Sequence, residues 1–118
     1  MKTDIKLIKI TDKTVQDFEA IFGKQKALPP TFPMVFYQFM DLPWQTESGA
    51  VLRKQACQLS QPIVQGQRYY CQIVLNIKRE RKHYTLYSET LYLYDMDGKE
   101  CAKCVSNLFT KSKLQKKK

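Results

Sequence analysis

The 118-residue sequence is poor in histidine, glycine and long apolar runs, and each shortage excludes a class of protein. Its one histidine, His83, leaves no basis for a zinc site of several histidines. Its four glycines do not form a Gly-rich phosphate loop. The longest segment without a charged residue, 27–40, spans 14 residues, whereas a membrane-spanning helix needs about 20. We therefore expect no metal, no bound cofactor and no transmembrane helix.

The cysteines do not suggest a disulfide framework or a redox site. The N-terminus lacks the apolar block of a secretory signal, so we expect a cytoplasmic protein, in which disulfides rarely persist. Cys101 and Cys104 have CxxC spacing, but they fall within a predicted strand, where residues three apart point to opposite faces. We expect these two, Cys57 and Cys71 to pack as small apolar side chains.

A positive charge of +9, from 20 Lys and Arg against 11 Asp and Glu, is the most prominent excess. Five of the lysines lie in residues 111–118, which contain no acidic residue. We interpret this segment as a flexible tail that follows a single domain over residues 1–110. A lysine-rich tail is tolerated without any binding partner, so this charge distribution disfavours nucleic acid as a partner.

Two helices are predicted in the first third of the chain. The apolar residues Val15, Phe18 and Ile21 recur at helical spacing and predict a helix over residues 13–22, ended by Gly23. A second helix is predicted over residues 33–40, after a proline-rich segment. It is apolar on nearly all faces, which is typical of a helix buried on most sides.

The remaining two thirds of the chain are predicted to form mainly β-strands. Alternating apolar and polar residues predict strands over 50–61, 68–78, 83–95 and 101–109, with a shorter one over 4–10. These segments predict an α+β protein in which an antiparallel sheet of about five strands curves around the second helix. This is the hot-dog arrangement.

Two segments carry a family resemblance. The run Pro29-Pro30-Thr31-Phe32-Pro33, followed by the turn at residues 61–67, resembles the MaoC-like dehydratases in their non-catalytic hot-dog half. The resemblance covers residues 27–110 and implies thioesters of coenzyme A or acyl carrier protein as ligands. Catalytic members use an Asp and a His on the loop before the central helix, but residues 22–27 contain no Asp, Asn or His here.

The resemblance therefore implies an acyl-thioester-binding or structural subunit that lacks the hydratase dyad. Such a subunit would form a homodimer, or a heterodimer with a catalytic hot-dog chain, and we expect no membrane partner. The candidate acyl-pocket residues are Thr31, Phe32, Met34 and Tyr37. The candidate contacts to coenzyme A phosphates are Arg53, Lys54, Arg79, Arg81 and Lys82.

Two alternatives stay open. The first is an active thioesterase or dehydratase with unorthodox residues, for which Asp41 and Glu47 are the candidate carboxylates. The second is a basic nucleic-acid-binding module, in which strand tyrosines would stack on bases. The alternation of residues 83–95 places these tyrosines on both faces of the sheet, which disfavours that module.

Overall fold

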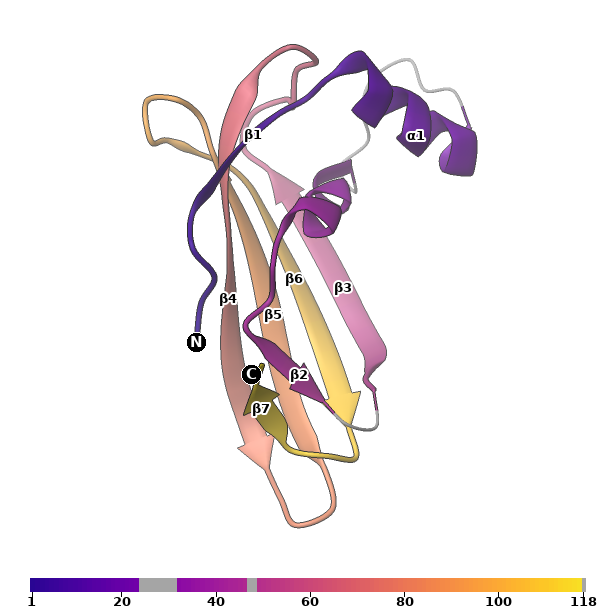
Figure 1. Ribbon diagram of the computed structural model, residues 1–118, viewed down its shortest axis with the longest axis vertical. Helices are drawn as coiled ribbons and strands as arrows, with labels where there is room; N and C mark the ends of the chain where they lie inside the picture. Colours follow the sequence, from indigo (N-terminus) through magenta and orange to yellow (C-terminus); the bar gives the residue numbers. More distant parts are fainter. Residues whose placement is uncertain (24–31, 47–48, 118) are drawn as a thin grey trace.

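The alternating segments form one strongly curved antiparallel sheet (Figure 1). The computed structural model describes residues 1–23, 32–46 and 49–117. Within them, the strands in spatial order are β1 (Lys6–Lys9), β4 (Arg68–Glu80), β5 (Thr85–Tyr94), β6 (Glu100–Thr110) and β3 (Val51–Leu59). The predicted α+β class and the five-stranded sheet are confirmed.

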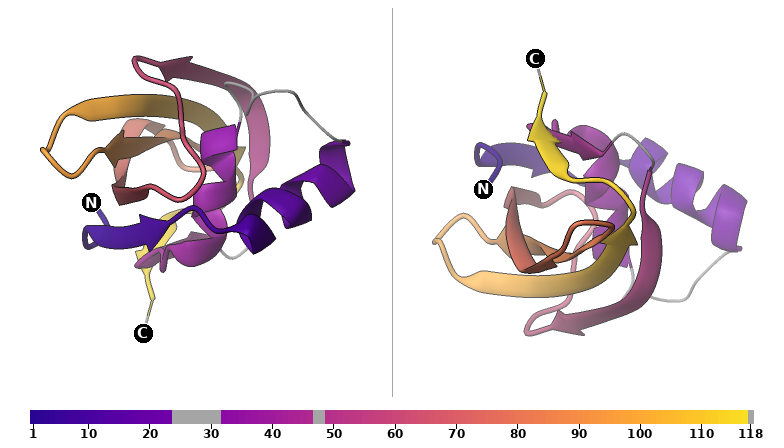
Figure 2. Two further views of the ribbon diagram at one scale, coloured as in Figure 1. Left: turned by 90° about the horizontal axis from the view of Figure 1, so that it is seen from above. Right: turned by 90° about the horizontal axis from the view of Figure 1, so that it is seen from below.

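The central helix, η1 (Phe32–Phe39), lies inside the curve of the sheet (Figure 2). It is a 3-10 helix of eight residues, so side chains three positions apart lie above one another. Phe32, Pro33 and Phe36 are buried, and the Phe36 ring meets Tyr69 of β4 edge to face at 6.3 Å. Thr31, which directly precedes this helix in the sequence, lies outside the described residues.

The first helix, α1 (Asp12–Phe22), packs against the core only through part of its apolar stripe. Thr11 caps it by accepting a hydrogen bond from the Thr14 amide at 3.2 Å, and Gly23 ends it at φ 84°. Phe18 is buried against the ring of Phe32 at 5.0 Å, whereas Ile21 is 76% exposed. Figure 2 shows why: the end of α1 extends beyond the sheet.

The concave face of the sheet consists of rows of paired residues. One row crosses four strands as Ile73, Leu91, Cys104 and Cys57, and the next crosses them as Leu75, Glu89, Ser106 and Gln55. The first row is apolar, while the second carries three polar side chains into the space below η1. Polar groups at such a position require hydrogen bonds or a ligand.

The lysine-rich end of the chain differs from the expected flexible tail. Strand β7 (Leu114–Lys116) pairs antiparallel with β2 (Trp44–Thr46), and the Lys117 amide donates to the carbonyl of Pro43 at 3.0 Å. Backbone hydrogen bonds hold this pair together, and these do not depend on side-chain polarity. The basic segment therefore lies beside the fold instead of trailing from it.

The cysteines are free thiols, with Cys57 half-buried and the other three buried. Cys101 and Cys104 are both buried, although residues three apart on a regular strand face opposite ways. The reason is a register shift: Leu93 pairs with Ala102 and Tyr94 pairs with Glu100, which leaves Cys101 at an irregularity. In the described part of the chain, no group of three or more His, Cys, Asp or Glu could hold a metal ion.

Within the described residues, no helix is both long enough and apolar enough to cross a membrane.

Candidate functional site

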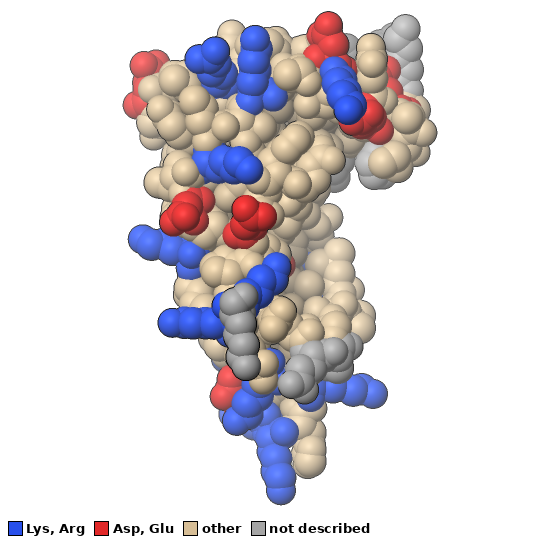
Figure 3. Space-filling model, viewed as in Figure 1, with Lys and Arg blue, Asp and Glu red and all other residues tan. Residues whose placement is uncertain are grey.

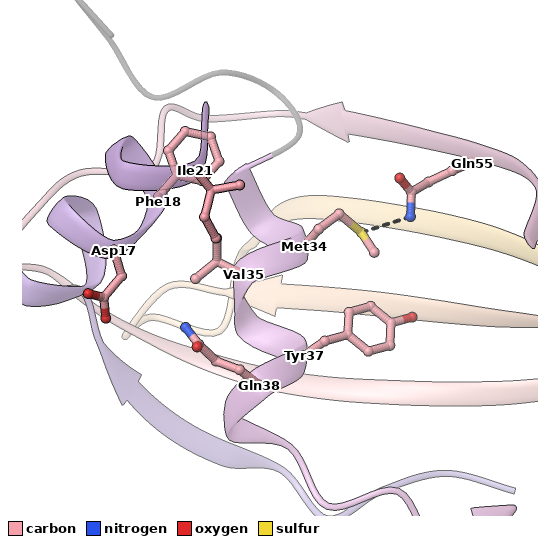
Figure 4. A pocket seen from close by; sticks show the side chains of 8 residues that line it. All are labelled: Asp17, Phe18, Ile21, Met34, Val35, Tyr37, Gln38 and Gln55. Atoms are coloured by element: carbon pink, nitrogen blue, oxygen red, sulfur yellow. Dashed lines mark hydrogen bonds between the residues drawn. The ribbon is translucent and has the colours of Figure 1, made fainter. Parts of the chain in front are cut away.

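A pocket of about 540 Å³ lies between α1, η1 and β3 (Figure 4). Its lining is mainly apolar, with two amides and one carboxylate. The residues that line it are Asp17, Phe18, Ile21, Met34, Val35, Tyr37, Gln38 and Gln55. Pockets that bind small molecules have this character, with an apolar wall and a few polar groups that orient the ligand.

The 3-10 geometry of η1 sorts its side chains into two walls. Met34 and Tyr37 are three positions apart and both point toward β3, whereas Val35 and Gln38 point toward α1 (Figure 4). Gln55 of β3 closes the first wall, because its side-chain amide donates to the sulfur of Met34 at 3.5 Å. The pocket thus depends on the short central helix for four of its side chains.

Below the pocket, the Tyr37 side chain lies near the row of the sheet that contains Glu89, Ser106 and Gln55, which we call the polar row. Its hydroxyl is buried without a hydrogen bond of ordinary geometry. Burial raises the pKa of Tyr37 well above its usual range, the Glu89 carboxyl raises it further, and the Ser106 hydroxyl lowers it in part. The Ser106 oxygen accepts a hydrogen bond from the Gln55 amide at 3.2 Å. Tyr37 therefore stays a neutral phenol at physiological pH.

Glu89 is the buried carboxyl of this row, 8% exposed. The indole N–H of Trp44 donates to its Oε2 at 2.7 Å. Burial raises the pKa of Glu89, and the indole hydrogen bond lowers it in part. The sequence analysis did not single out Glu89, yet its alternation with Leu91 and Leu93 placed it on the inward face and could have found it.

The candidate acyl-pocket residues fall into three groups. Met34 and Tyr37 line the pocket. Phe32 is fully buried against Phe18 and contributes to the core instead. Thr31 lies outside the described residues. The role of the first two in binding an acyl chain stays a prediction.

Of the two candidate carboxylates, the structure describes only Asp41. Asp41 is exposed beyond the end of η1 and is not part of the lining. Glu47 lies outside the described residues. The carboxylate that does line the pocket is Asp17 of α1, which the sequence analysis did not single out as a site residue. Only the packing of α1 against η1 could have revealed it.

The candidate phosphate contacts gather at the other end of the sheet. Arg53 and Lys54 line a second pocket of about 390 Å³ together with Lys78, whose Nζ donates to Asn107 at 2.8 Å. Arg79 follows on β4. Arg81 and Lys82 are exposed in the turn after that strand. None of the five candidates lines the first pocket, so their contact with coenzyme A phosphates stays a prediction.

The strand tyrosines lie on both faces of the sheet. Tyr92 and Tyr94 stack on the outer face at 6.2 Å, and Lys103 lies over the Tyr92 ring at 5.8 Å. Tyr69 and Tyr87 face the core and are buried. A stacking surface for nucleic acid would need these rings on one face.

Comparison with solved structures identifies the class of protein: the chain has the hot-dog fold. Its structural neighbours are MaoC-like dehydratases and R-hydratases. No protein-family model matches the sequence, and no curated protein matches it.

Three of these structures illustrate the likeness. A chain of the HadBC (3R-hydroxyacyl-ACP dehydratase) complex of Mycobacterium tuberculosis has a TM-score of 0.67 at 12% identity, covering 92% of this chain and 96% of that one. The MaoC-like dehydratase of Rhodospirillum rubrum has a TM-score of 0.64 at 10% identity, with coverage of 96% and 92%. A Streptococcus mutans protein bound to acetyl CoA has a TM-score of 0.54 at 11% identity, with coverage of 92% and 81%. At these identities the likeness establishes the fold.

Proposed function

We propose that this chain is an acyl-thioester-binding subunit of a dehydratase-type dimer, and that a partner chain supplies the catalytic acid and base. The observation that carries the proposal is the apolar pocket beside η1. Its volume of about 540 Å³ suits a medium-length acyl chain, because ligand pockets typically measure about 300–1,000 Å³. The hot-dog neighbours support the ligand class, since one of them is bound to acetyl CoA and another is a hydroxyacyl-ACP dehydratase.

The distribution of acid and base groups supports a subunit without the hydratase dyad. Hydration of an enoyl thioester requires a base to activate water and an acid to protonate the adjacent carbon, both within hydrogen-bond reach of the substrate. The one histidine, His83, is exposed in the turn between β4 and β5, at the far end of the sheet from α1 (Figure 1). Asp17 therefore has no histidine beside it in the pocket.

Calorimetric titration with coenzyme A, acetyl-CoA, butyryl-CoA and octanoyl-CoA tests the proposal. Each methylene that enters the pocket should contribute about 0.8 kcal/mol, so affinity should rise about fourfold per carbon until the pocket is filled. Met34→Glu should abolish this dependence on chain length, because it places a charge in the apolar wall. The matched control is Met96→Glu, at an exposed position of the β5–β6 hairpin.

Equal affinity for coenzyme A and octanoyl-CoA would contradict acyl binding. Hydration of crotonyl-CoA by the purified chain alone would contradict the absence of a dyad.

A second candidate function rests on Asp17. A carboxylate in an acyl pocket can take a proton from water as the water oxygen attacks the thioester carbonyl, after which the C–S bond breaks and the thiolate receives the proton. The chain would then be a thioesterase. Release of free thiol from octanoyl-CoA that is lost in Asp17→Asn but kept in Asp41→Asn would favour this reading, since Asp41 lies outside the pocket lining.

A further inference from the structure

Two cysteines lie directly opposite each other on neighbouring strands, β3 and β6 (Figure 1). Cys57 of β3 pairs with Cys104 of β6, and both pack in the apolar row of the concave face beside Leu91. Cys104 is fully buried, Cys57 is half-buried, and both are free thiols. Residues that pair in this way carry their side chains on the same face of the sheet, so the two sulfur atoms are neighbours.

The register separates this pair from the other cysteines. Cys71 lies opposite Leu93 of β5, and Cys101 falls at the irregularity at the start of β6. The Cys101 thiol donates to the carbonyl oxygen of Lys99 at 3.5 Å. Within the described sheet, Cys57 and Cys104 are therefore the two cysteines that face each other.

The spacing of paired strands suits a disulfide between them. Directly opposite residues have Cα atoms about 4.5–5.5 Å apart, and disulfides span Cα separations of about 4.4–6.8 Å. Burial raises the pKa of Cys104 well above its usual range, and a side-chain hydrogen bond with Cys57 raises it further, which shows that the thiols are in contact. A disulfide draws the Cβ atoms slightly closer than a cross-strand pair usually holds them. β3 can make this small shift, because within the described residues it is hydrogen-bonded to β6 alone.

We propose that Cys57 and Cys104 form a reversible cross-strand disulfide when the protein meets a low-molecular-weight disulfide such as oxidised glutathione. The thiolate of Cys57, the more exposed of the two, attacks one glutathione sulfur. The glutathione S–S bond breaks, and the departing thiolate takes up a proton. Cys104 then loses its proton and attacks the Cys57 sulfur, which releases the second glutathione. Two electrons leave the protein, and one glutathione disulfide becomes two thiols.

The disulfide fixes the β3 wall of the pocket beside η1. Gln55, two positions before Cys57, lines that pocket and donates to the Ser106 hydroxyl, two positions after Cys104. In the reduced protein, backbone hydrogen bonds and this side-chain contact hold the wall against β6. An outer strand with mostly exposed residues opens easily, so a covalent bond changes its mobility more than that of a central strand.

Mass spectrometry of the full chain tests the proposal. The reduced protein is incubated with oxidised glutathione at mildly alkaline pH, and the remaining thiols are then alkylated in denaturant. The wild type should lose two hydrogens in mass and leave two of its four thiols open to alkylation, and peptide mapping should join Cys57 to Cys104. Amide hydrogen exchange of β3 should slow several-fold in the oxidised protein and recover with dithiothreitol.

Variants separate the two steps of the reaction. Cys104→Ala should stop at the intermediate, with glutathione attached to Cys57, whereas Cys57→Ser should keep its three remaining thiols. The matched control is Cys101→Ala, which removes a cysteine that does not face another and should form the disulfide as the wild type does. The mapping of the wild type needs no variant, so it decides the outcome even where a variant is unfolded by circular dichroism.

A wild-type chain that keeps four free thiols, or whose disulfide joins other cysteines or two chains, overturns the proposal. Unchanged exchange of the β3 amides after oxidation overturns the effect on the pocket wall. Neither readout involves acyl binding, so a failure of the proposed function would leave this inference standing.

Discussion

Glu89 is the residue whose position is hardest to explain by stability alone. It lies on β5 between Tyr87 and Leu91, both buried, and its carboxylate accepts a hydrogen bond from the indole N–H of Trp44. A buried carboxylate with one neutral hydrogen-bond donor is less stable than a hydrated one, and burial accordingly raises the pKa of Glu89. A fold that retains such a group gives up stability at neutral pH.

We predict that Glu89→Gln raises the stability of the protein at neutral pH and flattens its dependence on pH. Because the folded pKa is above the unfolded one, folding is most favourable below the unfolded pKa of about 4.3 and weakens as pH rises through the folded value. The glutamine oxygen can still accept from Trp44. Urea unfolding at pH 4 and pH 8 measures this, and an equal loss of stability with pH in both proteins would contradict it.

At the scale of elements, η1 is a short helix that depends on buried aromatic side chains. Eight residues of 3-10 helix have little stability of their own, so the packing of Phe32 and Phe36 into the concave face must hold the helix in place. The same helix supplies Met34, Val35, Tyr37 and Gln38 to the pocket. The core and the site therefore share one element.

We predict that Phe36→Ala destabilises the protein by about 3–5 kcal/mol, because it removes a fully buried ring and leaves a cavity. Gln38→Ala, at an exposed position of the same helix, should cost less than about 0.5 kcal/mol. The fluorescence of Trp44, the single tryptophan, follows unfolding in urea. A change below about 1 kcal/mol for Phe36→Ala would show that η1 is not anchored there.

The elements also show what the sequence could predict. The alternation of apolar and polar residues predicted the four long strands, and the proline-rich segment predicted the start of η1. Both predictions succeeded because these signals are local in the sequence. Strand β7 gave no such signal: its pairing with β2 uses backbone groups, while its lysines suggested a solvated tail. Asp17 entered the pocket through the packing of two helices, and a distant contact of this kind leaves no mark in local sequence.

At the scale of the whole molecule, basic side chains lie at both ends, but they have few acidic neighbours at the end away from the pocket. The pocket lies among α1, η1 and the middle of β3, whereas the basic side chains with few acidic neighbours gather around the β4–β5 turn and β7 (Figures 1 and 3). Under the proposed function, the acyl chain would enter at the apolar end of the molecule.

The central claim is that an acyl chain enters the pocket beside η1. The chain has four methionines, so ¹³C-methyl labelling gives four methyl signals that single Met→Leu variants assign. On titration with octanoyl-CoA, the Met34 methyl should shift and saturate, while the exposed Met96 methyl should stay in place. Coenzyme A alone should leave Met34 unchanged. A Met34 signal that does not move while calorimetry shows binding would contradict the account.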